Sequence, residues 1–146
     1  MNNNYTKEML QKLYENINAT KAGLIDIMPK LKDTRLIADI TCLIEGYSQF
    51  AKDAESLGHN VNEKNKIGDA IARVGAKFAV EMKTVNDSSS EHISQMIIEE
   101  TATGITDNIS LIRDYENTSC SEKVLTLAPS VVNFQERSIE KIKPYI

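Results

Sequence analysis

Apolar residues recur every three or four positions along most of the chain, which is the spacing of helices with one buried face. The first such run extends about 25 residues, from Thr6 to Leu31, and a second runs from Leu36 to Leu57. Asp33 is suited to cap the second helix and Gly58 to end it. No useful stretch alternates between apolar and polar residues as a half-buried strand does, so the predicted fold class is all-α.

Three further helices are predicted. A less apolar one covers about residues 62–86, a fourth runs from the stretch "NDSSSEHISQMIIEE" to Tyr115, and a fifth follows the turn "ENTSCSE" and continues through Ile142. Pro129 lies inside the fifth helix and should bend it or remove one backbone hydrogen bond. With the third helix as a crossover, the second and fourth run parallel. This gives a ferritin-like up-down bundle of four long helices plus a crossover helix.

Size and composition fit one domain over residues 1–146. The chain is 41% hydrophobic and 26% charged but only 5% aromatic, without Trp, so its core must be aliphatic. The net charge is −4 and Lys and Arg form no stripe, which argues against nucleic-acid binding. No signal-peptide run or 18-residue apolar window is present, so we expect a cytoplasmic protein without membrane contact. Abundant Asn, Lys and Ile suggest a bacterium with an AT-rich genome.

Two long segments read "DTRLIADI…EGYSQFAKDAESLG" and "AKFAVEMKTVNDSSSEHISQMIIEETATGITDNI", and a final Glu-rich helix follows them. With these segments the chain resembles small uncharacterised bacterial proteins of ferritin-like fold. The resemblance covers most of the chain and rests on a pattern of helices and turns. It implies the ferritin-like bundle and implies no particular activity.

A ferritin-like di-iron site is a specific test of the chain's chemistry. Such a site takes a Glu from each of two helices and Glu-x-x-His from each of the other two. The two histidines, His59 and His92, both have Ser three residues before them. The stretches "EGYS" from Glu45 and "ERSI" from Glu136 place Ser and Ile where imidazoles are needed. A metal site is therefore not expected, and its remaining candidate ligands are Glu45, Glu100 and Glu136.

The start of the fourth helix is better explained by capping than by metal binding. Asp87 or Ser88 is placed to be the N-cap, with Ser88 and Glu91 forming a capping box. His92 and Glu99 lie about two turns apart, roughly 10 Å, which is too far to share one ion. We therefore expect His92 to be a solvated residue of the first turn.

Gly104, in the middle of the fourth helix, costs up to about 1 kcal/mol relative to Ala, so some interaction should offset it. One explanation is the close approach of another helix, near Gly23 or Gly46. The other is a small polar cavity at the bundle centre, in which Tyr47 bonds Glu100 or a water. The residues proposed for this cavity are Tyr47, Glu100 and Asn108.

Small residues of the third helix repeat at helical spacing and predict a smooth groove. They are Gly68, Ala72, Gly75 and Ala79. This groove would either pack the crossover onto its own bundle or form a homodimer interface.

The two cysteines follow no metal spacing, and we expect them to be reduced. Cys42 lies next to the second apolar stripe and is expected to be a small core residue. Cys120 lies near the start of the fifth helix, where a thiol pKa can be lowered, but Glu116 and Glu122 oppose that effect. A spare thiol and a redox role are the two interpretations of Cys120.

These observations favour a non-enzymatic cytoplasmic helical bundle that binds itself, another protein or a small ligand, without a cofactor. The alternative is a ferritin-like metal-carboxylate protein with an atypical, histidine-poor site. A thiol-based sensor is the third hypothesis and depends on Cys120 alone.

Overall fold

The computed structural model describes residues 4–58 and 76–146, and every regular element in these ranges is helical. The described helices are α1 (Asn4–Ile27), α2 (Thr34–Leu57), α4 (Ala76–Thr84), α5 (Ser90–Tyr115) and α6 (Glu122–Ile142), with 3₁₀ turns η1 (Met28–Lys30) and η3 (Lys143–Tyr145). The all-α prediction is confirmed for the described part of the chain.

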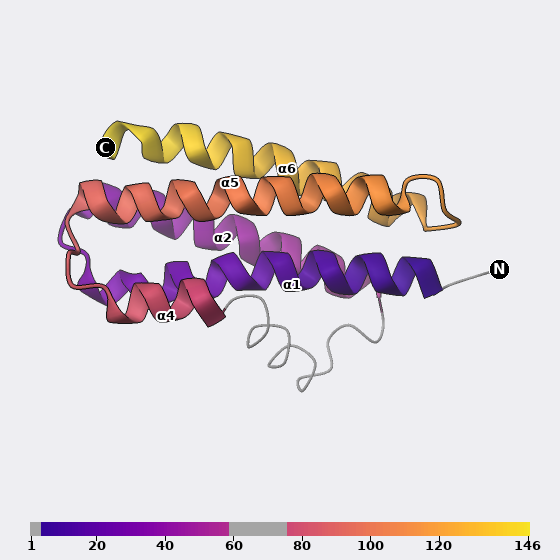
Figure 1. Cartoon of the computed structure of the whole chain (residues 1–146), viewed down its shortest axis with the longest axis horizontal. Coiled ribbons are helices and arrows are strands. Elements are labelled where there is room, and N and C mark those ends of the chain that lie inside the picture. Colours follow the sequence, from indigo (N-terminus) through magenta and orange to yellow (C-terminus); the bar gives the residue numbers. More distant parts are fainter. Residues whose placement is uncertain (1–3, 59–75) are drawn as a thin grey trace.

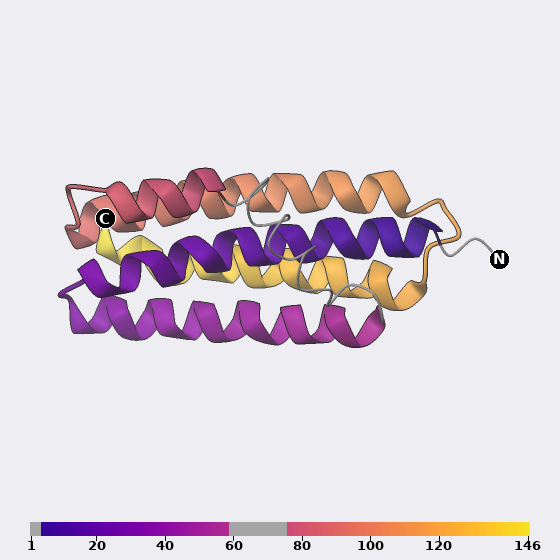
Figure 2. The same cartoon turned by 90° about the horizontal axis from the view of Figure 1, so that it is seen from below.

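The four long helices form two antiparallel hairpins, α1 with α2 and α5 with α6 (Figure 1). Helix α1 packs against both α2 and α5, and α6 packs against the same two helices. The shorter α4 packs on the outside of this group, against α1 (Figure 2). As predicted for the second and fourth helices, α2 and α5 run in the same direction (Figure 1).

The core between these helices is aliphatic, as the scarcity of aromatic residues requires. The apolar stripes face inward on every long helix, and their most buried members are at most 1% exposed. Examples are Leu13, Ile17, Leu36, Ile40, Ile93, Ile97 and Val131. Burying one such side chain contributes about 1.5–3 kcal/mol relative to its exposed state, so these stripes supply most of the driving force for association of the helices.

Asp33 caps α2 as the sequence predicts. Its Oδ1 accepts hydrogen bonds from the backbone N–H groups of Arg35 (2.9 Å) and Leu36 (3.2 Å). Its Oδ2 accepts a third from the Ser90 hydroxyl at 3.2 Å, which joins the start of α2 to the start of α5. These donors, the Leu36 N–H first, hold the pKa of Asp33 below its ordinary value.

The end of α1 and the start of α5 differ from the prediction. Helix α1 ends at Ile27, because Pro29 follows in η1 and disfavours α conformation in the residue before it. The N-cap of α5 is Ser89, whose hydroxyl accepts from the His92 N–H, so the predicted N-cap at Asp87 or Ser88 and the capping box of Ser88 with Glu91 are wrong. Asp87 instead accepts a bond from the Ser89 N–H at 3.0 Å.

The predicted third helix is described only in part. Helix α4 ends at Thr84 rather than at residue 86, and residues 59–75 lie outside the described ranges. Helix α6 continues through Pro129 without ending there.

Two glycines allow aromatic rings to dock between helices. A Cβ at Gly23 of α1 would stand 2.1 Å from the Phe78 ring of α4, and one at Gly46 of α2 would stand 2.4 Å from the Phe134 ring of α6. Real Cβ contacts are not this short, so glycine is needed at both positions. The Phe134 ring also packs edge-on against Tyr47, with ring centroids 5.1 Å apart. These two notches fix α4 on α1 and α6 on α2.

Lys30 of η1 holds the other end of α4. Its ammonium group donates to the backbone carbonyl oxygens of Met82 (3.1 Å) and Val85 (3.2 Å), and also to that of Lys83. The last carbonyls of a helix have no partner within the helix, and a cation is favoured there by the helix dipole. Met82 is fully buried beside this contact. The described part of α4 is therefore anchored at both ends.

Candidate functional site

A layer of polar side chains crosses the interior of the bundle. We call it the polar layer; its members are Asn16 on α1, Tyr47 on α2, Glu100 and Asn108 on α5, and Gln135 on α6. The Asn108 side chain is fully buried and donates to Gln135 Oε1 at 3.0 Å. Its own Oδ1 accepts from Asn16 Nδ2 at 2.8 Å. One asparagine thus links three helices through a chain of amide hydrogen bonds.

Gly104 is explained by this layer. A Cβ at position 104 would stand 2.7 Å from Gln135 Nε2, so the glycine makes room for the amide of Gln135. The two other glycines considered, Gly23 and Gly46, face Phe78 and Phe134 instead. The close contact with the Gln135 amide of α6 therefore offsets the cost of placing a glycine inside the α5 helix.

The sequence analysis did not single out Gln135 as a buried polar residue, although helical spacing indicates it. It lies four residues after Val131 and three before Ser138, which are both buried, so helical spacing puts it on the buried face of α6. A long amide at such a position requires a partner inside the bundle. Asn108 on α5 is that partner.

Tyr47 lies close to Gln135 and Glu100, but its predicted hydrogen bond to Glu100 is not formed. The hydroxyl is buried and makes no regular hydrogen bond among the described residues. Burial raises the pKa of the Tyr47 phenol well above its usual range; the Gln135 side chain is near enough to lower it in part, and the charge of Glu100 raises it further. Asn108 bonds Gln135 and Asn16 rather than Tyr47.

Glu100 is the carboxylic acid of the polar layer, and its pKa is strongly shifted. It is half-buried on α5, and burial together with the charges of Asp107 and Glu81 raises its pKa to about 7. The Thr20 hydroxyl and the charge of Lys77 act in the opposite direction. Since Glu81 and Lys77 belong to α4 and Thr20 to α1, this carboxyl lies where α1, α4 and α5 meet.

The three candidate metal ligands are not brought together. Glu45 and Glu136 are exposed, whereas Glu100 is half-buried. Helical spacing accounts for this, because Glu45 is two residues from the buried Tyr47 and Glu136 is next to the buried Gln135, so both point to other faces. In the described ranges no three His, Cys, Asp or Glu side chains are placed to hold an ion.

Of the two histidines, only His92 lies in the described ranges. His92 is in the first turn of α5, half-buried, and its backbone N–H completes the cap, as expected for a helix start. His59 lies outside the described residues.

The cysteines do not form a reactive pair. Cys42 is exposed, so its predicted place in the core is wrong; it lies beside the α2 stripe, on the solvent side of the boundary. Cys120 is buried with its Sγ 3.6 Å from Met9 Sδ. Burial raises the pKa of the Cys120 thiol, which is opposite to the shift that activates a thiol.

The small-residue groove falls mostly outside the described ranges. Gly68, Ala72 and Gly75 lie within residues 59–75, and only Ala79, half-buried on α4, is described. Whether this groove packs on the bundle or joins two copies stays a prediction.

A groove of about 590 Å³ lies between α1 and α2. We call it the α1–α2 groove; it is lined by Tyr14, Asn18, Lys21, Ala22, Ile25, Ser48, Ala51, Lys52 and Glu55. The Tyr14 hydroxyl donates to Glu55 Oε1 at 2.5 Å and crosses from one helix to the other. Burial, with the Glu55 carboxylate next, raises the pKa of the Tyr14 phenol, so this hydroxyl remains a donor.

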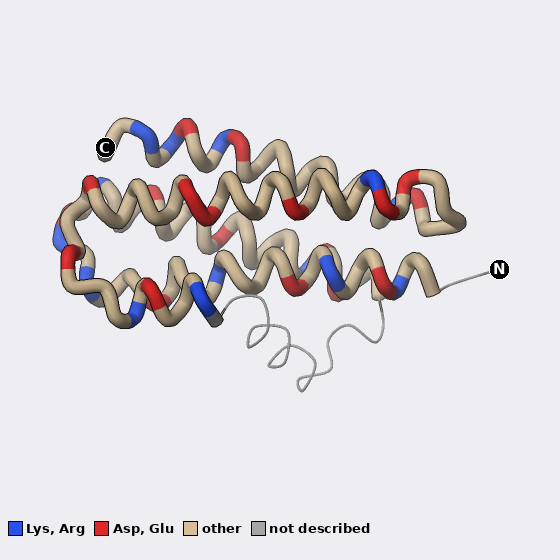
Figure 3. Tube along the Cα trace, in the orientation of Figure 1, with Lys and Arg blue, Asp and Glu red and all other residues tan. Residues whose placement is uncertain are grey.

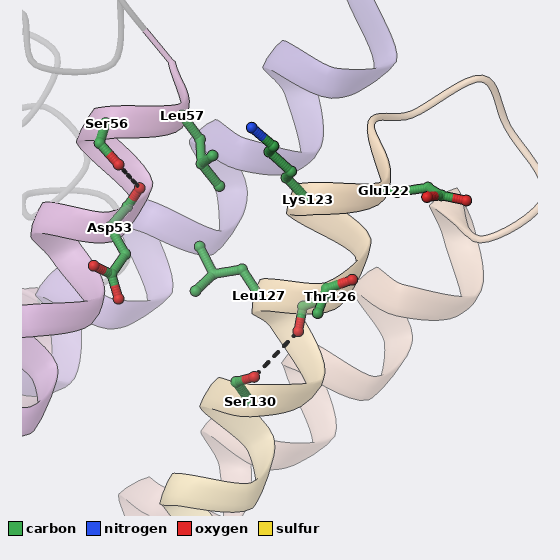
Figure 4. Close-up of a pocket in the computed structure, with 8 residues that line it drawn as sticks. All are labelled: Asp53, Ser56, Leu57, Glu122, Lys123, Thr126, Leu127 and Ser130. Atoms are coloured by element: carbon green, nitrogen blue, oxygen red, sulfur yellow. Dashed lines mark hydrogen bonds between the residues drawn. The ribbon is translucent and has the colours of Figure 1, made fainter.

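A second groove, of about 530 Å³, lies between the end of α2 and the start of α6 (Figure 4). We call it the α2–α6 groove; it is lined by Asp53, Ser56, Leu57, Glu122, Lys123, Thr126, Leu127 and Ser130. Leu57 and Leu127 point toward each other across it, and Lys123 stands at its edge. The hydroxyls of Ser56 and Ser130 bond backbone carbonyls of their own helices at 2.8 and 3.2 Å. These two hydroxyls therefore already have partners, and the charged residues of this groove are Asp53, Glu122 and Lys123.

Comparison with known proteins finds no matching family model, no matching curated protein and no matching solved structure. The resemblance to small bacterial ferritin-like proteins therefore stays a prediction. Basic and acidic residues are interspersed along α1, α4 and α6, whereas the charged residues of α5 are mostly acidic (Figure 3). None of those helices has the length and apolar character that crossing a membrane requires.

Proposed function

We propose that this protein is a non-enzymatic helical bundle that acts by binding, and that the α1–α2 groove is its binding site for a small ligand. The observation that carries the proposal is the composition of the groove. Its volume of about 590 Å³ is in the range of small-molecule sites, and its lining combines three apolar side chains, Ala22, Ile25 and Ala51, with polar and charged ones.

The groove has both fixed and available polar groups. Tyr14 and Glu55 hold each other across the two helices, which gives the site a preformed end. The lysines at its edge, Lys21 and Lys52, have no hydrogen bond or ion pair with the residues that the structure describes. A ligand would therefore find cationic donors without breaking an existing pair.

We also propose that the bundle has the ferritin-like arrangement. The support is the order of the two hairpins, with α2 and α5 running in the same direction and a crossover between them (Figure 1). A cytoplasmic location and self-association as a homodimer are kept as proposals from the sequence. The exposed thiol of Cys42 agrees with a reducing compartment.

Fragment binding followed by two-dimensional amide NMR tests the proposed site. We expect hits to shift the amides of Ala22, Ser48 and Ala51. Ser48 is half-buried in the groove wall, and Ser48→Phe should fill the groove and remove these shifts.

The matched control is Ser130→Phe, which places the same ring in the α2–α6 groove. This variant should leave the binding unchanged. Hits that move the amides around Leu57 and Leu127, and that disappear in Ser130→Phe, would overturn the assignment of the α1–α2 groove.

A further inference from the structure

We infer that the ligand of the α1–α2 groove is a small organic monoanion, with one acidic group and a short apolar part. This inference rests on the proposed function and adds the chemical class of the ligand. It is argued from the charges and the apolar side chains of the groove.

The charge of the groove differs from that of the whole protein. The lining holds two lysines, Lys21 and Lys52, and one carboxylate, Glu55, so it carries one net positive charge. The full chain carries a net charge of −4. A locally positive site on an acidic protein favours an anion at that place, while the surrounding acids disfavour a highly charged one.

Of these three charged groups, the Glu55 carboxylate is the least available to interact with a ligand. One of its oxygens already accepts the Tyr14 hydroxyl at 2.5 Å. The two ammonium groups come from different helices and have no described partner. Because both lysines line the same groove, an acid group bound there would be attracted by both.

The apolar part of the ligand follows from the apolar side chains of the groove. Ala22 and Ala51 leave space between the helices, and Ile25 is 47% exposed at the edge. A short alkyl chain covering Ala22 and Ile25 would gain about 25 cal/mol for each Å² of apolar surface removed from water. A fully polar anion such as inorganic phosphate would gain nothing from this apolar surface.

The α2–α6 groove provides an internal comparison. It has nearly the same volume and contains two leucines, but its charged residues are Asp53, Glu122 and Lys123, one net negative charge. Volume alone would therefore not make a ligand prefer one groove to the other. We expect a carboxylate ligand to prefer the α1–α2 groove to the α2–α6 groove, because only the first has a net positive charge.

Hexanoate and its neutral analogue hexanamide are the probes. In amide NMR titrations of the full chain, hexanoate should produce saturable millimolar binding at Ala22, Ser48 and Ala51. Hexanamide should bind about tenfold more weakly, because two exposed ion pairs each contribute a modest amount. Added salt should weaken the binding of hexanoate more than that of hexanamide.

The double variant Lys21→Gln/Lys52→Gln should lose about tenfold in affinity for hexanoate and keep its affinity for hexanamide. The control, Lys7→Gln/Lys141→Gln, removes the same charge from exposed positions on α1 and α6 and should change neither. Unchanged amide spectra outside the groove verify that both variants fold. Equal losses in the two double variants would overturn a specific role for Lys21 and Lys52.

The failures of the two proposals can be told apart. If hexanamide or neutral fragments bind this groove as tightly as hexanoate, the acidic ligand class is wrong and the binding site stands. If hexanoate shifts no amides in the groove while neutral fragments do, the inference fails alone. If neither the fragments nor hexanoate bind there, both proposals fail.

Discussion

The amide of Gln135 on α6 occupies the space that a side chain at Gly104 on α5 would need, with Nε2 2.7 Å from the ideal Cβ position. This contact places the amide where it can accept from Asn108 at 3.0 Å. A glycine in the middle of a long helix is thus tied to a buried hydrogen bond between two helices.

Gly104→Ala should destabilise the protein although alanine is the better helix former. The helix preference favours alanine by up to about 1 kcal/mol. Displacing the buried amide costs about 1–3 kcal/mol as overpacking, so after subtracting the helix preference we expect a net loss of up to about 2 kcal/mol in the free energy of unfolding. Urea denaturation measures this. A net gain near 1 kcal/mol would show that Gln135 moves aside freely, and would contradict the packing explanation.

Asn108→Ala should cost about 2–4 kcal/mol, because it leaves Gln135 Oε1 and Asn16 Nδ2 without their partner. A double-mutant cycle with Gln135→Ala should be non-additive by about 1 kcal/mol or more, since the second change removes one of the stranded groups. Denaturant titrations of the two single variants and the double variant give the coupling. Additive losses would mean that the two amides do not act together.

The apolar stripes and the cap of α2 were predictable because each depends on local spacing. Ile40 and Ile97 repeat with their neighbours at helical intervals, and Asp33 stands directly before a helix. Ser89 was missed as the cap of α5, because three successive serines offer nearly equal local choices. Pro29 ended α1 earlier than its apolar stripe suggested.

Partners across helices were less predictable, because they depend on the rotation and relative height of two helices. The sequence singled out Gly104 but not Gln135. It also singled out Tyr47, but not that its hydroxyl has no hydrogen-bond partner among the described residues. The α1–α2 groove has no sequence motif at all. Lys21 and Lys52 are ordinary surface lysines until the two helices bring them to one groove.

Lys30→Met should loosen α4 while leaving the four long helices in place. The substitution keeps most of the side-chain length but removes the donors to the carbonyls of Met82, Lys83 and Val85. Bonds from a charged donor contribute about 1.5–3 kcal/mol, and partial exposure reduces this, so we expect about 1–2 kcal/mol. Hydrogen exchange should show faster exchange of α4 amides. Lys32→Met is the nearby exposed control, and equal exchange in the two variants would contradict the anchoring role.

Glu100 should make the stability of the protein depend on pH near neutrality. Its pKa is about 7 in the folded protein and 4.5 as the ordinary value, so between these values the folded state binds more protons than the unfolded state. The free energy of unfolding must then fall as pH rises from about 4.5 to about 7, and this contribution stays constant above. Since the carboxyl is only half-buried, solvent screening reduces the effect to roughly 1–2 kcal/mol.

Glu100→Gln isolates this contribution, because the amide keeps the shape of the side chain and cannot ionise. The variant should be more stable than the natural protein at pH 8 and similar to it at pH 5, by urea denaturation at each pH. Glu99→Gln, one residue away and exposed, is the control and should follow the natural protein at both values. If Glu100→Gln is no more stable than the natural protein at pH 8, the junction of α1, α4 and α5 does not disfavour the charged form of the Glu100 carboxyl. The raised pKa of Glu100 would then be wrong.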